Sequence, residues 1–180
     1  MKSETACASV RAASERDTRE IADIYAHYVR SSSISFETAP PGAGEIEQRR
    51  CLVIQKGLPY LVAELYGRVV GYAYATPYRA REAYRYTVED SIYVHPEYLG
   101  KGIGHVLMPA LIEACERAGR RQMVAVIAGS ENSASVRFHG KFDFRLCGTL
   151  RAVGFKQGCW VDTVLMQRVL GAGDATAPQN

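Results

Sequence analysis

The chain has 180 residues, enough for one domain with a single core, and 47% of them are hydrophobic and 23% charged, as in ordinary soluble proteins. A net charge of +3 without a run of basic residues argues against a nucleic-acid partner, and the absence of any apolar stretch of membrane-spanning length argues against a membrane partner. The five scattered cysteines include no Cys-x-x-Cys pair, and residues 1–10 lack the apolar stretch of a signal peptide, so we expect a cytoplasmic protein with reduced thiols and no metal site.

The first half of the chain contains patterns typical of strands, helices and a hairpin. Ser14 followed by Asp17 resembles a capping box, and it precedes apolar residues at helical spacing over 21–29. Tyr66-Gly67-Arg68 separates two extended runs, as a hairpin turn does. The predicted elements are a strand at 10–13, a helix from Ser14 through 29, a loop at 31–44 with an extended piece at 33–36, a helix at 45–56, and strands at 60–65 and 69–76.

The second half begins with an irregular, basic and aromatic loop at 77–86. The nearly continuous apolar run at 122–128 is expected of a strand that is buried on both faces. The other predicted elements are a strand at 87–95, helices at 103–119 and 132–142, a hairpin of 144–153 and 160–169 with Gly154 and Gly158 in its turn, and a flexible tail at 171–180. This order, without a linker or repeat, predicts one domain over residues 1–170: a mixed α/β fold with a six- to seven-stranded sheet and helices on both faces.

The most informative segment is the glycine-rich run at 100–104, between the strand at 87–95 and the helix at 103–119. Unpaired amides at a helix N-terminus, flanked by small side chains, let phosphate oxygens approach the backbone closely. A Walker loop is excluded because Gly102 follows Lys101 where serine or threonine is required, and a dinucleotide fingerprint is excluded because Leu107 occupies the third glycine position. Ordering three glycines within five residues costs much conformational entropy on folding, and this cost favours a bound phosphorylated cofactor over a turn without a ligand.

The segment at 99–104 resembles the acetyl-CoA motif of the GNAT N-acetyltransferases, Arg/Gln-x-x-Gly-x-Gly/Ala, with Leu99 in place of the usual arginine or glutamine. Within this superfamily the chain is similar to the branch of phosphinothricin and methionine-sulfone acetyltransferases, most distinctively at Thr87-Val88-Glu89-Asp90-Ser91-Ile92-Tyr93-Val94. Asp143 departs from the family, which has glycine there. The other similar segments are 34–38, 71–74, 78–81, 84–86, 132–139 and 154–162, so that the resemblance covers most of residues 10–168.

The resemblance implies the GNAT acyl-CoA N-acyltransferase fold and an enzyme that uses acetyl-CoA as co-substrate. The implied reaction is direct transfer of the acetyl group to the α-amine of a small amino acid or analogue, of the phosphinothricin, methionine sulfone or methionine sulfoximine type. Two alternatives stay open: acetylation of a protein N-terminus or another small amine, and a non-catalytic acyl-CoA-binding regulator.

The resemblance also assigns roles to residues. Glu89 is the expected general base, acting directly or through water, and the alternative is that it pairs with Arg79 or Arg85 and only orients the loop. The Val94 amide is the expected oxyanion donor. His139 either protonates the CoA thiolate or packs beside the pantetheine without a proton role. Asn132 is expected to bond the pantetheine, to cap its helix, or both. The full set of expected cofactor contacts is Ile92, Tyr93, Val94, Gly100, Lys101, Gly102, Ile103, Gly104, His105, Asn132 and Ser135.

Arginines interleaved with tyrosines precede the strand at 87–95 and suit an acceptor with acid groups, because a guanidinium binds carboxylate or phosphinate oxygens in a fork. Three arginines without a wider basic field are too few for nucleic acid. The expected acceptor contacts are Phe36, Glu37, Tyr78, Arg79, Arg81, Tyr84, Arg85 and Thr87. Similar enzymes commonly form homodimers, and Val153, Phe155 and Trp160 on the last hairpin are candidate contacts, or else cover the core of their own chain.

Overall fold

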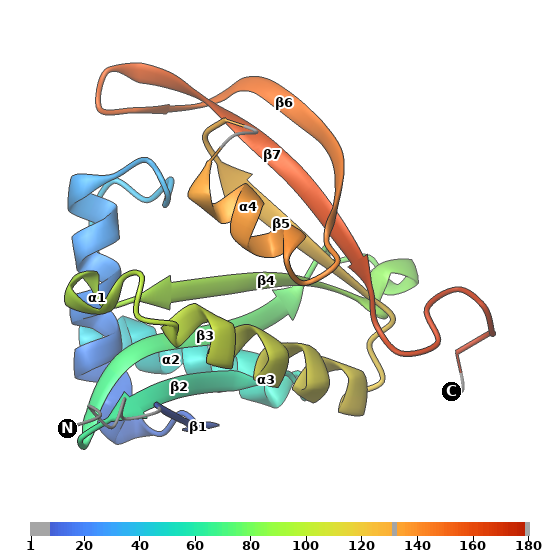
Figure 1. Ribbon diagram of the computed structural model, residues 1–180, viewed down its shortest axis with the longest axis horizontal. Helices are drawn as coiled ribbons and strands as arrows, with labels where there is room; N and C mark the ends of the chain where they lie inside the picture. The colour runs from blue at the N-terminus through green and yellow to red at the C-terminus, as the bar shows by residue number, and fades with distance from the viewer. Residues whose placement is uncertain (1–7, 131–132, 179–180) are drawn as a thin grey trace, which may run out of the picture.

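One seven-stranded sheet of order β1-β2-β3-β4-β5-β7-β6 organises the computed structural model, which describes residues 8–130 and 133–178 (Figure 1). The strands are β1 (Ser9–Ala12), β2 (Tyr60–Leu65), β3 (Arg68–Pro77), β4 (Thr87–Val94), β5 (Gln122–Ala128), β6 (Arg145–Lys156) and β7 (Cys159–Val169). The helices in the described residues are α1 (Thr18–Ser31), α2 (Ala43–Gln55), α3 (Ile103–Arg117) and α4 (Ala134–Gly140), with short 3-10 turns η1 (Glu15–Asp17), η2 (Glu82–Tyr84) and η3 (Pro96–Tyr98). The mixed α/β fold that the sequence predicts is therefore confirmed.

The two halves of the sheet meet along β4 and β5. Strands β1 to β4 are antiparallel neighbours, and so are β5, β7 and β6, whereas β4 and β5 run parallel. Their pairing is short: it runs from Thr87 opposite Gln122 to Asp90 opposite Ala125, and beyond it the two strands diverge (Figure 1). We call the gap beyond Asp90 the β4–β5 opening.

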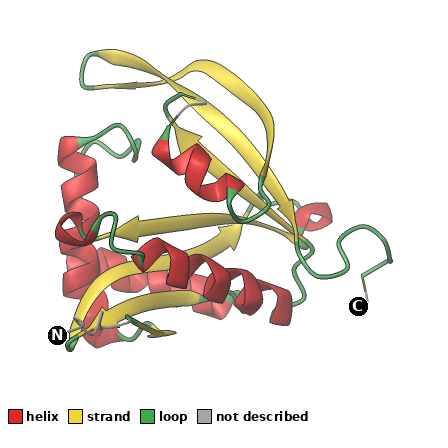
Figure 2. Cartoon of the chain, viewed as in Figure 1, coloured by secondary structure: helices red, strands yellow, loops and turns green. Residues whose placement is uncertain are grey.

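Helices cover both faces of the sheet, as predicted (Figure 2). Helix α3 crosses β3 so closely that a Cβ atom on Gly71 would lie 2.9 Å from Cγ2 of Ile103. On the opposite face, Tyr25 and Tyr28 of α1 pack against Tyr93 of β4, with ring centroids 5.1 and 5.5 Å apart. Because side chains of a strand alternate between faces, neighbouring residues of β4 face different helices. Among the helices of residues 8–130 and 133–178, none is long and apolar enough to cross a bilayer.

The start of α1 agrees with the capping pattern in the sequence. The Asp17 carboxylate accepts the backbone N–H of Ser14 at 2.7 Å and both guanidinium ends of Arg11 at 2.7 and 2.8 Å. Arg11 also bonds Glu64 of β2 at 2.8 Å, which ties the helix entrance to the sheet edge. Burial raises the pKa of Asp17, but the bonds from Arg11 and Ser14 outweigh it and lower that pKa to about 2.

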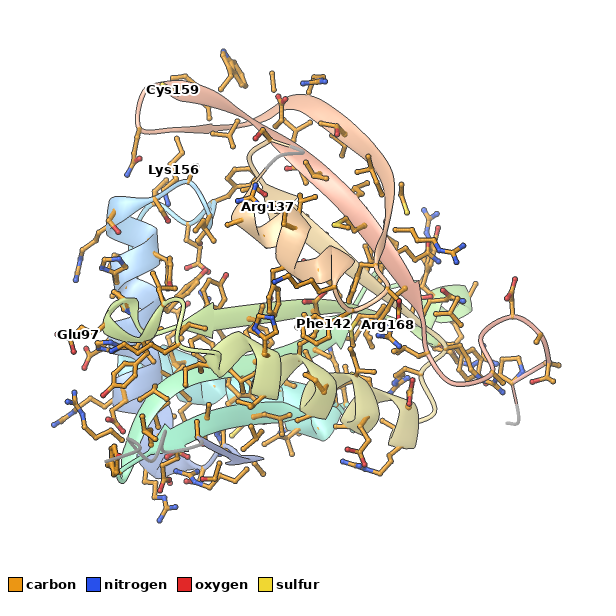
Figure 3. All side chains as sticks on the ribbon, viewed as in Figure 1. Glu97, Arg137, Phe142, Lys156, Cys159 and Arg168 are labelled. Atoms are coloured by element: carbon orange, nitrogen blue, oxygen red, sulfur yellow. The ribbon has the colours of Figure 1, made fainter. Side chains whose placement is uncertain are left out.

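The last hairpin differs from its predicted form. Strand β6 continues to Lys156, and Gly154 lies within the strand opposite Val161 instead of in the turn. The glycine serves close packing instead of a turn, because a Cβ atom there would lie 2.6 Å from Cζ of Phe36. Lys156 reaches the loop after α1 and donates to the Ser35 carbonyl at 2.5 Å (Figure 3). Residues 33–36 were predicted to be extended, but 33–35 are bends, and the bond from Lys156 ties this segment to the hairpin.

The segment that follows β7, predicted to be a flexible tail, makes hydrogen bonds with the rest of the chain, one of them from Arg121 to the Thr176 hydroxyl at 3.4 Å. The Gly171 amide donates to Glu116 of α3 at 3.0 Å, and the Arg121 guanidinium donates to the Gly173 carbonyl at 3.5 Å. Its first residues are therefore tied to the end of α3.

Candidate active site

The backbone of β4 presents free groups to the β4–β5 opening. His95 donates to Val70 at 2.9 Å and Tyr78 donates to Thr87 at 3.2 Å, which shows that the odd-numbered residues of β4 bond to β3. Because bonding direction alternates along an antiparallel strand, the amides of Ile92 and Val94 point toward β5, which has already diverged. The Val94 amide therefore faces the opening. Its carbonyl accepts the Tyr28 hydroxyl at 2.5 Å, which fixes this end of the strand to α1.

A cavity of about 170 Å³ fills the opening between β4, β5 and α4, and we call it the inter-strand cavity. Three of the expected cofactor contacts meet there, Ile92, Tyr93 and Ser135, together with His139. Asn132 lies outside the described residues; the Ser133 hydroxyl accepts the Val136 amide at 3.2 Å and so caps α4. The cavity residues are Ile34, Asp90, Ile92, Tyr93, Ala125, Val126, Ile127, Ala128, Ser133, Ala134, Ser135 and His139.

The glycine-rich turn lies between η3 and the first residue of α3. Gly102 adopts φ +85°, a left-handed conformation that favours glycine, and it precedes the helix as its N-cap. Two residues expected to contact the cofactor use their amides within the turn: Lys101 donates to Tyr98 at 3.2 Å and His105 donates to Gly102 at 2.9 Å. These two residues can therefore contact a phosphate through their side chains, whereas the amides at 102–104 lack the carbonyl partners of a preceding helical turn.

The third glycine of the turn has a different physical basis. A Cβ atom on Gly104 would lie 3.0 Å from Cε2 of Phe138, so glycine here allows α4 to pack against the start of α3. Leu99, which replaces the family's arginine or glutamine, is 57% exposed. Its apolar side chain offers no hydrogen bond to an anion.

Glu89 lies on the face of β4 that is opposite to α3 and α4, flanked by Thr76 of β3 and Val124 of β5. Partial burial raises its pKa, the charge of Asp90 raises it further, and Arg79 opposes both effects. A carboxylate whose pKa is raised toward neutrality is suited to accept a proton from an amine. Of its expected ion partners, Arg85 pairs with Glu82 at 3.5 Å and Arg79 lies 4.5 Å from the centroid of the Tyr78 ring.

His139 forms a buried pair that sequence analysis missed. Its Nε2 lies 3.1 Å from Oδ2 of Asp90, and its Nδ1 lies 2.8 Å from the Ser135 carbonyl oxygen. Burial lowers the pKa of His139, but the bond to Asp90 and its charge raise it more, so that the net shift is upward. Strand alternation could have predicted that Asp90 has a buried partner. With Glu89 on one face of β4, Asp90 points into the core on the other face, where a carboxylate requires a partner.

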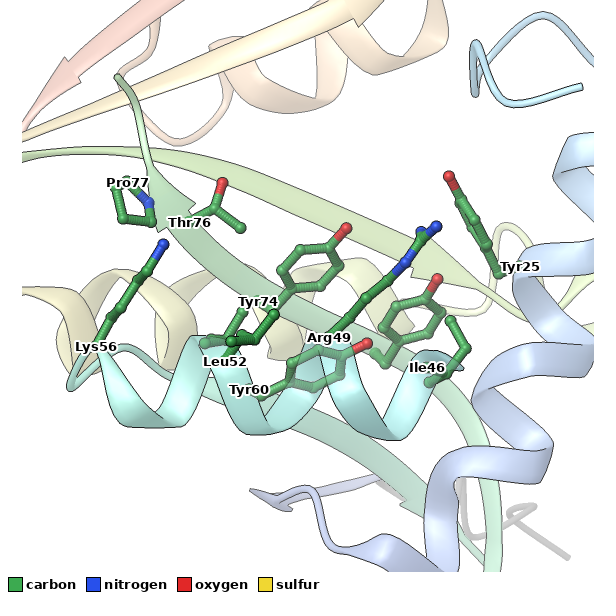
Figure 4. Close-up of a pocket in the computed structure, with 11 residues that line it drawn as sticks. Tyr25, Ile46, Arg49, Leu52, Lys56, Tyr60, Tyr74, Thr76 and Pro77 are labelled. Atoms are coloured by element: carbon green, nitrogen blue, oxygen red, sulfur yellow. The ribbon is translucent and has the colours of Figure 1, made fainter. Parts of the chain in front are cut away.

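A second cavity, of about 310 Å³, lies under α2 on the Glu89 face, and we call it the tyrosine cavity (Figure 4). The rings of Tyr60 and Tyr74 stack at 4.8 Å along its floor. Arg49 lines it and bonds Glu37 at 2.6 Å, and Glu37 also accepts the Tyr25 hydroxyl at 2.9 Å. The expected acceptor residue Glu37 thus bonds two residues of the cavity lining without lining the cavity itself, and Tyr25, Arg49 and Tyr60 were not predicted to lie at the site. Its lining is Tyr25, Ile46, Arg49, Leu52, Val53, Lys56, Tyr60, Tyr72, Tyr74, Thr76 and Pro77.

A third cavity, of about 250 Å³, brings together Tyr78, Tyr84 and Thr87 of the expected acceptor set, and we call it the loop cavity. Thr76 lines the tyrosine cavity and Val124 lines the loop cavity, so Glu89 lies between the two. The other expected acceptor residues line neither cavity: these are Phe36, which covers Gly154, Arg81, which is exposed, and Glu37, Arg79 and Arg85. The structure therefore brings three of the eight expected acceptor residues to a cavity beside Glu89.

Comparisons with known proteins identify the family of this chain. The model of the acetyltransferase (GNAT) family matches residues 21–144. The chain is 49% identical over 171 residues to a phosphinothricin N-acetyltransferase of Alcaligenes faecalis, covering 95% of this chain and 87% of that one. It is 37% identical over 163 residues to an L-methionine sulfoximine/L-methionine sulfone acetyltransferase of Salmonella typhimurium, covering 88% and 92%.

A solved structure is also similar. The crystal structure of a GNAT superfamily phosphinothricin acetyltransferase from Sinorhizobium meliloti in complex with AcCoA superposes with a TM-score of 0.92 at 44% identity, covering 97% of this chain and 94% of that one. Sequence, fold and family model thus agree over most of the chain. The protein belongs to the GNAT family of acetyltransferases.

Proposed function

We propose that this protein transfers the acetyl group of acetyl-CoA to the α-amine of a small anionic amino acid or analogue, of the phosphinothricin, methionine sulfone or methionine sulfoximine type, in the cytoplasm. The main supporting observation is the position of Glu89, a carboxylate with a raised pKa on β4 between the two cavities of the acceptor face. The names of the similar proteins support the acceptor class, and the AcCoA complex of a similar enzyme supports the co-substrate.

Each end of the acetyl-CoA has a proposed place. The pyrophosphate lies against the backbone at 102–104, where the left-handed Gly102 leaves open space at the start of α3. The pantetheine and acetyl group lie in the inter-strand cavity, against the β5-facing backbone of Ile92 and Val94. In the described residues, no three or more His, Cys, Asp or Glu side chains lie together as a possible metal site.

The proposed reaction uses three groups of the chain. Glu89 takes one proton from the acceptor ammonium, so that the nitrogen lone pair can attack the thioester carbon. The Val94 amide donates a hydrogen bond to the developing oxyanion. When the C–S bond breaks, the sulfur takes a proton from His139, and the nitrogen loses its second proton as the amide forms. In the net reaction the ammonium loses two protons: the CoA thiol gains one proton, and one is released to solvent.

Steady-state turnover with an acceptor panel tests the proposed function. We expect phosphinothricin, methionine sulfone or methionine sulfoximine to give the highest kcat/KM, well above that of a peptide with a free N-terminus. A polyamine should also react poorly, because its positive charge is repelled by the loop at 77–86, which we call the arginine loop after Arg79, Arg81 and Arg85. Higher turnover of the peptide would instead assign protein N-terminal acetylation. Binding of acetyl-CoA without turnover of any acceptor would assign a non-catalytic regulator.

The acceptor site can be tested through the arginine loop. We expect Arg79→Ala and Arg85→Ala to raise the acceptor KM by about tenfold or more, because loss of one hydrogen bond to a charged group costs about 1.5–3 kcal/mol. The KM for acetyl-CoA should stay nearly constant, since these charges face the acceptor. Arg117→Ala, on the exposed end of α3, is the matched control. Equal rises in both KM values would assign the loop a structural role.

We further propose a homodimer that uses the β6–β7 hairpin. Val153, Phe155 and Trp160 are 54%, 60% and 67% exposed, so they do not cover the core of their own chain. Exposed aromatic and aliphatic residues of this kind favour a two-fold contact. Light scattering at micromolar concentration should give about twice the 19.8 kDa mass of one chain, and Trp160→Lys should reduce it toward 19.8 kDa. A monomer mass for the unaltered protein would rule the dimer out.

A further inference from the structure

The buried pair of Asp90 and His139 determines where one proton lies. Nδ1 of His139 lies 2.8 Å from the Ser135 carbonyl, which can only accept a hydrogen bond, and 3.3 Å from the Ser135 hydroxyl, which can accept as well as donate. The shorter contact, to the carbonyl, places a proton on Nδ1. Nε2 then faces Oδ2 of Asp90 at 3.1 Å, and this contact is favourable only if a proton lies between the two atoms. The side chains of His139 and Asp90 are 4% and 1% exposed, so water cannot substitute for either partner. The pair therefore holds one proton at the wall of the inter-strand cavity.

Asp90 depends on this bond, and it also lies beside Glu89. Its second oxygen, Oδ1, is buried and has no hydrogen-bond partner in the described part of the chain, so the Asp90 side chain depends on its bond to His139. Glu89 is the next residue along β4, with its side chain on the opposite face of the sheet. Asp90 thus contacts the proposed acid, His139, and is the chain neighbour of the proposed base, Glu89.

We propose that Asp90 is a positioning residue that sets the protonation of both the acid and the base of this enzyme: it keeps the proton on His139, and its negative charge makes Glu89 a stronger base. The kinetic part of this inference rests on the proposed function. The direction of both effects follows from Coulomb's law, because a negative charge stabilises a proton on each neighbour. The raised pKa values of Glu89 and His139 agree with it.

The other groups around the pair are accounted for. Cys115 of α3 faces Asp90, and burial together with the Asp90 charge raises the pKa of its thiol to about 12, so it stays uncharged at assay pH. The His105 ring of α3 packs against the rings of Phe138 and Phe142. On the other face, Glu89 meets the charge of Arg79 and influences the Tyr74 hydroxyl. On the Asp90 face, Arg168 of β7 donates to the Phe142 carbonyl at 2.7 Å. The buried apolar residues of β3, β5 and β7 on that face are Ala73, Ala75, Met123, Ala125, Val164 and Met166.

The test is the pH profile of kcat for Asp90→Asn, which removes the charge and keeps the shape. Loss of the charge weakens the base and the proton affinity of the ring together, so both limbs of the bell-shaped profile should move to lower pH, and kcat should fall by roughly tenfold or more on the alkaline side, where the acid is lost. Asp143→Asn removes the same charge from an exposed turn near α4 and should leave both limbs in place. A lower kcat with unmoved limbs would show that Asp90 is merely structural and overturn the proposal.

A measurement on the ligand-free, unaltered protein separates this inference from the proposed function and does not require the variant to fold. NMR of nitrogen-15-labelled histidine should show His139 with protons on both ring nitrogens at pH values where an ordinary histidine is neutral. In Asp90→Asn the same ring should lose a proton at lower pH. A neutral His139 ring in the unaltered protein at those pH values would overturn the proposal even if acetyl transfer is observed; failure of acetyl transfer with a doubly protonated ring would overturn only the proposed function.

Discussion

Glu89→Gln is expected to lower kcat by about 10²- to 10⁴-fold, the range that a positioned general base contributes. The amide keeps the size of the side chain and the hydrogen bonds of β4, but it cannot take a proton from the acceptor ammonium. Because the base must be ionised, activity of the unaltered enzyme should fall as the pH drops through the raised pKa of Glu89. Stopped assays over a pH series measure both effects.

Two controls define what the Glu89 result means. Binding of acetyl-CoA to Glu89→Gln, measured by calorimetry, should be unchanged, because the proposed cofactor groups lie at the inter-strand cavity and the start of α3. Glu113→Gln removes an exposed carboxylate of α3 that pairs with Arg117, and it should retain full kcat. If Glu89→Gln keeps a near-normal kcat across the pH range, the amine loses its proton to solvent and Glu89 is not the base.

Gly102→Val is expected to weaken acetyl-CoA binding by roughly 10- to 100-fold, since each hydrogen bond to a charged group is worth about 1.5–3 kcal/mol and a branched side chain would stand where the phosphates approach. A Cβ atom on Gly102 meets nothing within 4 Å, so the open space there belongs to the ligand in our proposal. Calorimetric titration of the folded variant with acetyl-CoA gives the Kd.

The confounding effect in this experiment is backbone strain, because Gly102 has φ +85°. Gly119→Val provides the match: Gly119 follows the other end of α3, has φ +72°, and a Cβ atom on it likewise meets nothing within 4 Å. Both variants should lose similar stability in thermal unfolding, but only Gly102→Val should lose cofactor affinity. Equal affinities for the two variants would remove the pyrophosphate from this turn.

The features that the sequence predicted well depend on local patterns. The strand, glycine turn and helix around 100–104 are specified by residues adjacent in the chain, and the apolar run of β5 indicates its burial directly. Glu89 was found in the same way, from a short block of β4. The strand that contains Gly154 was also predicted, and only its C-terminal end was wrong. Its pairing with β7 continues past the glycine, against which the Phe36 ring of a distant segment lies.

The features that the sequence did not predict depend on contacts between distant segments. The His139 ring pairs with a residue 49 positions earlier, and nothing in α4 itself indicates this partner. Arg49 was assigned to an ordinary helix, and its bond to Glu37 exists only because α2 packs beside the loop after α1. Tyr60 was assigned only to a strand, but its ring stacks on Tyr74 of the neighbouring strand and forms part of the floor of a cavity.

The most direct measurement of the central claim is the identity of the reaction product. The protein is incubated with acetyl-CoA and the best acceptor of the panel, released thiol is counted, and the acceptor and the protein are analysed by mass spectrometry. Direct transfer predicts one acetyl group on the α-nitrogen of the acceptor for each CoA thiol released, with no acetyl group on the protein. Thiol release without an acetylated amine, or an acetyl group on one of the cysteines during turnover, would contradict it.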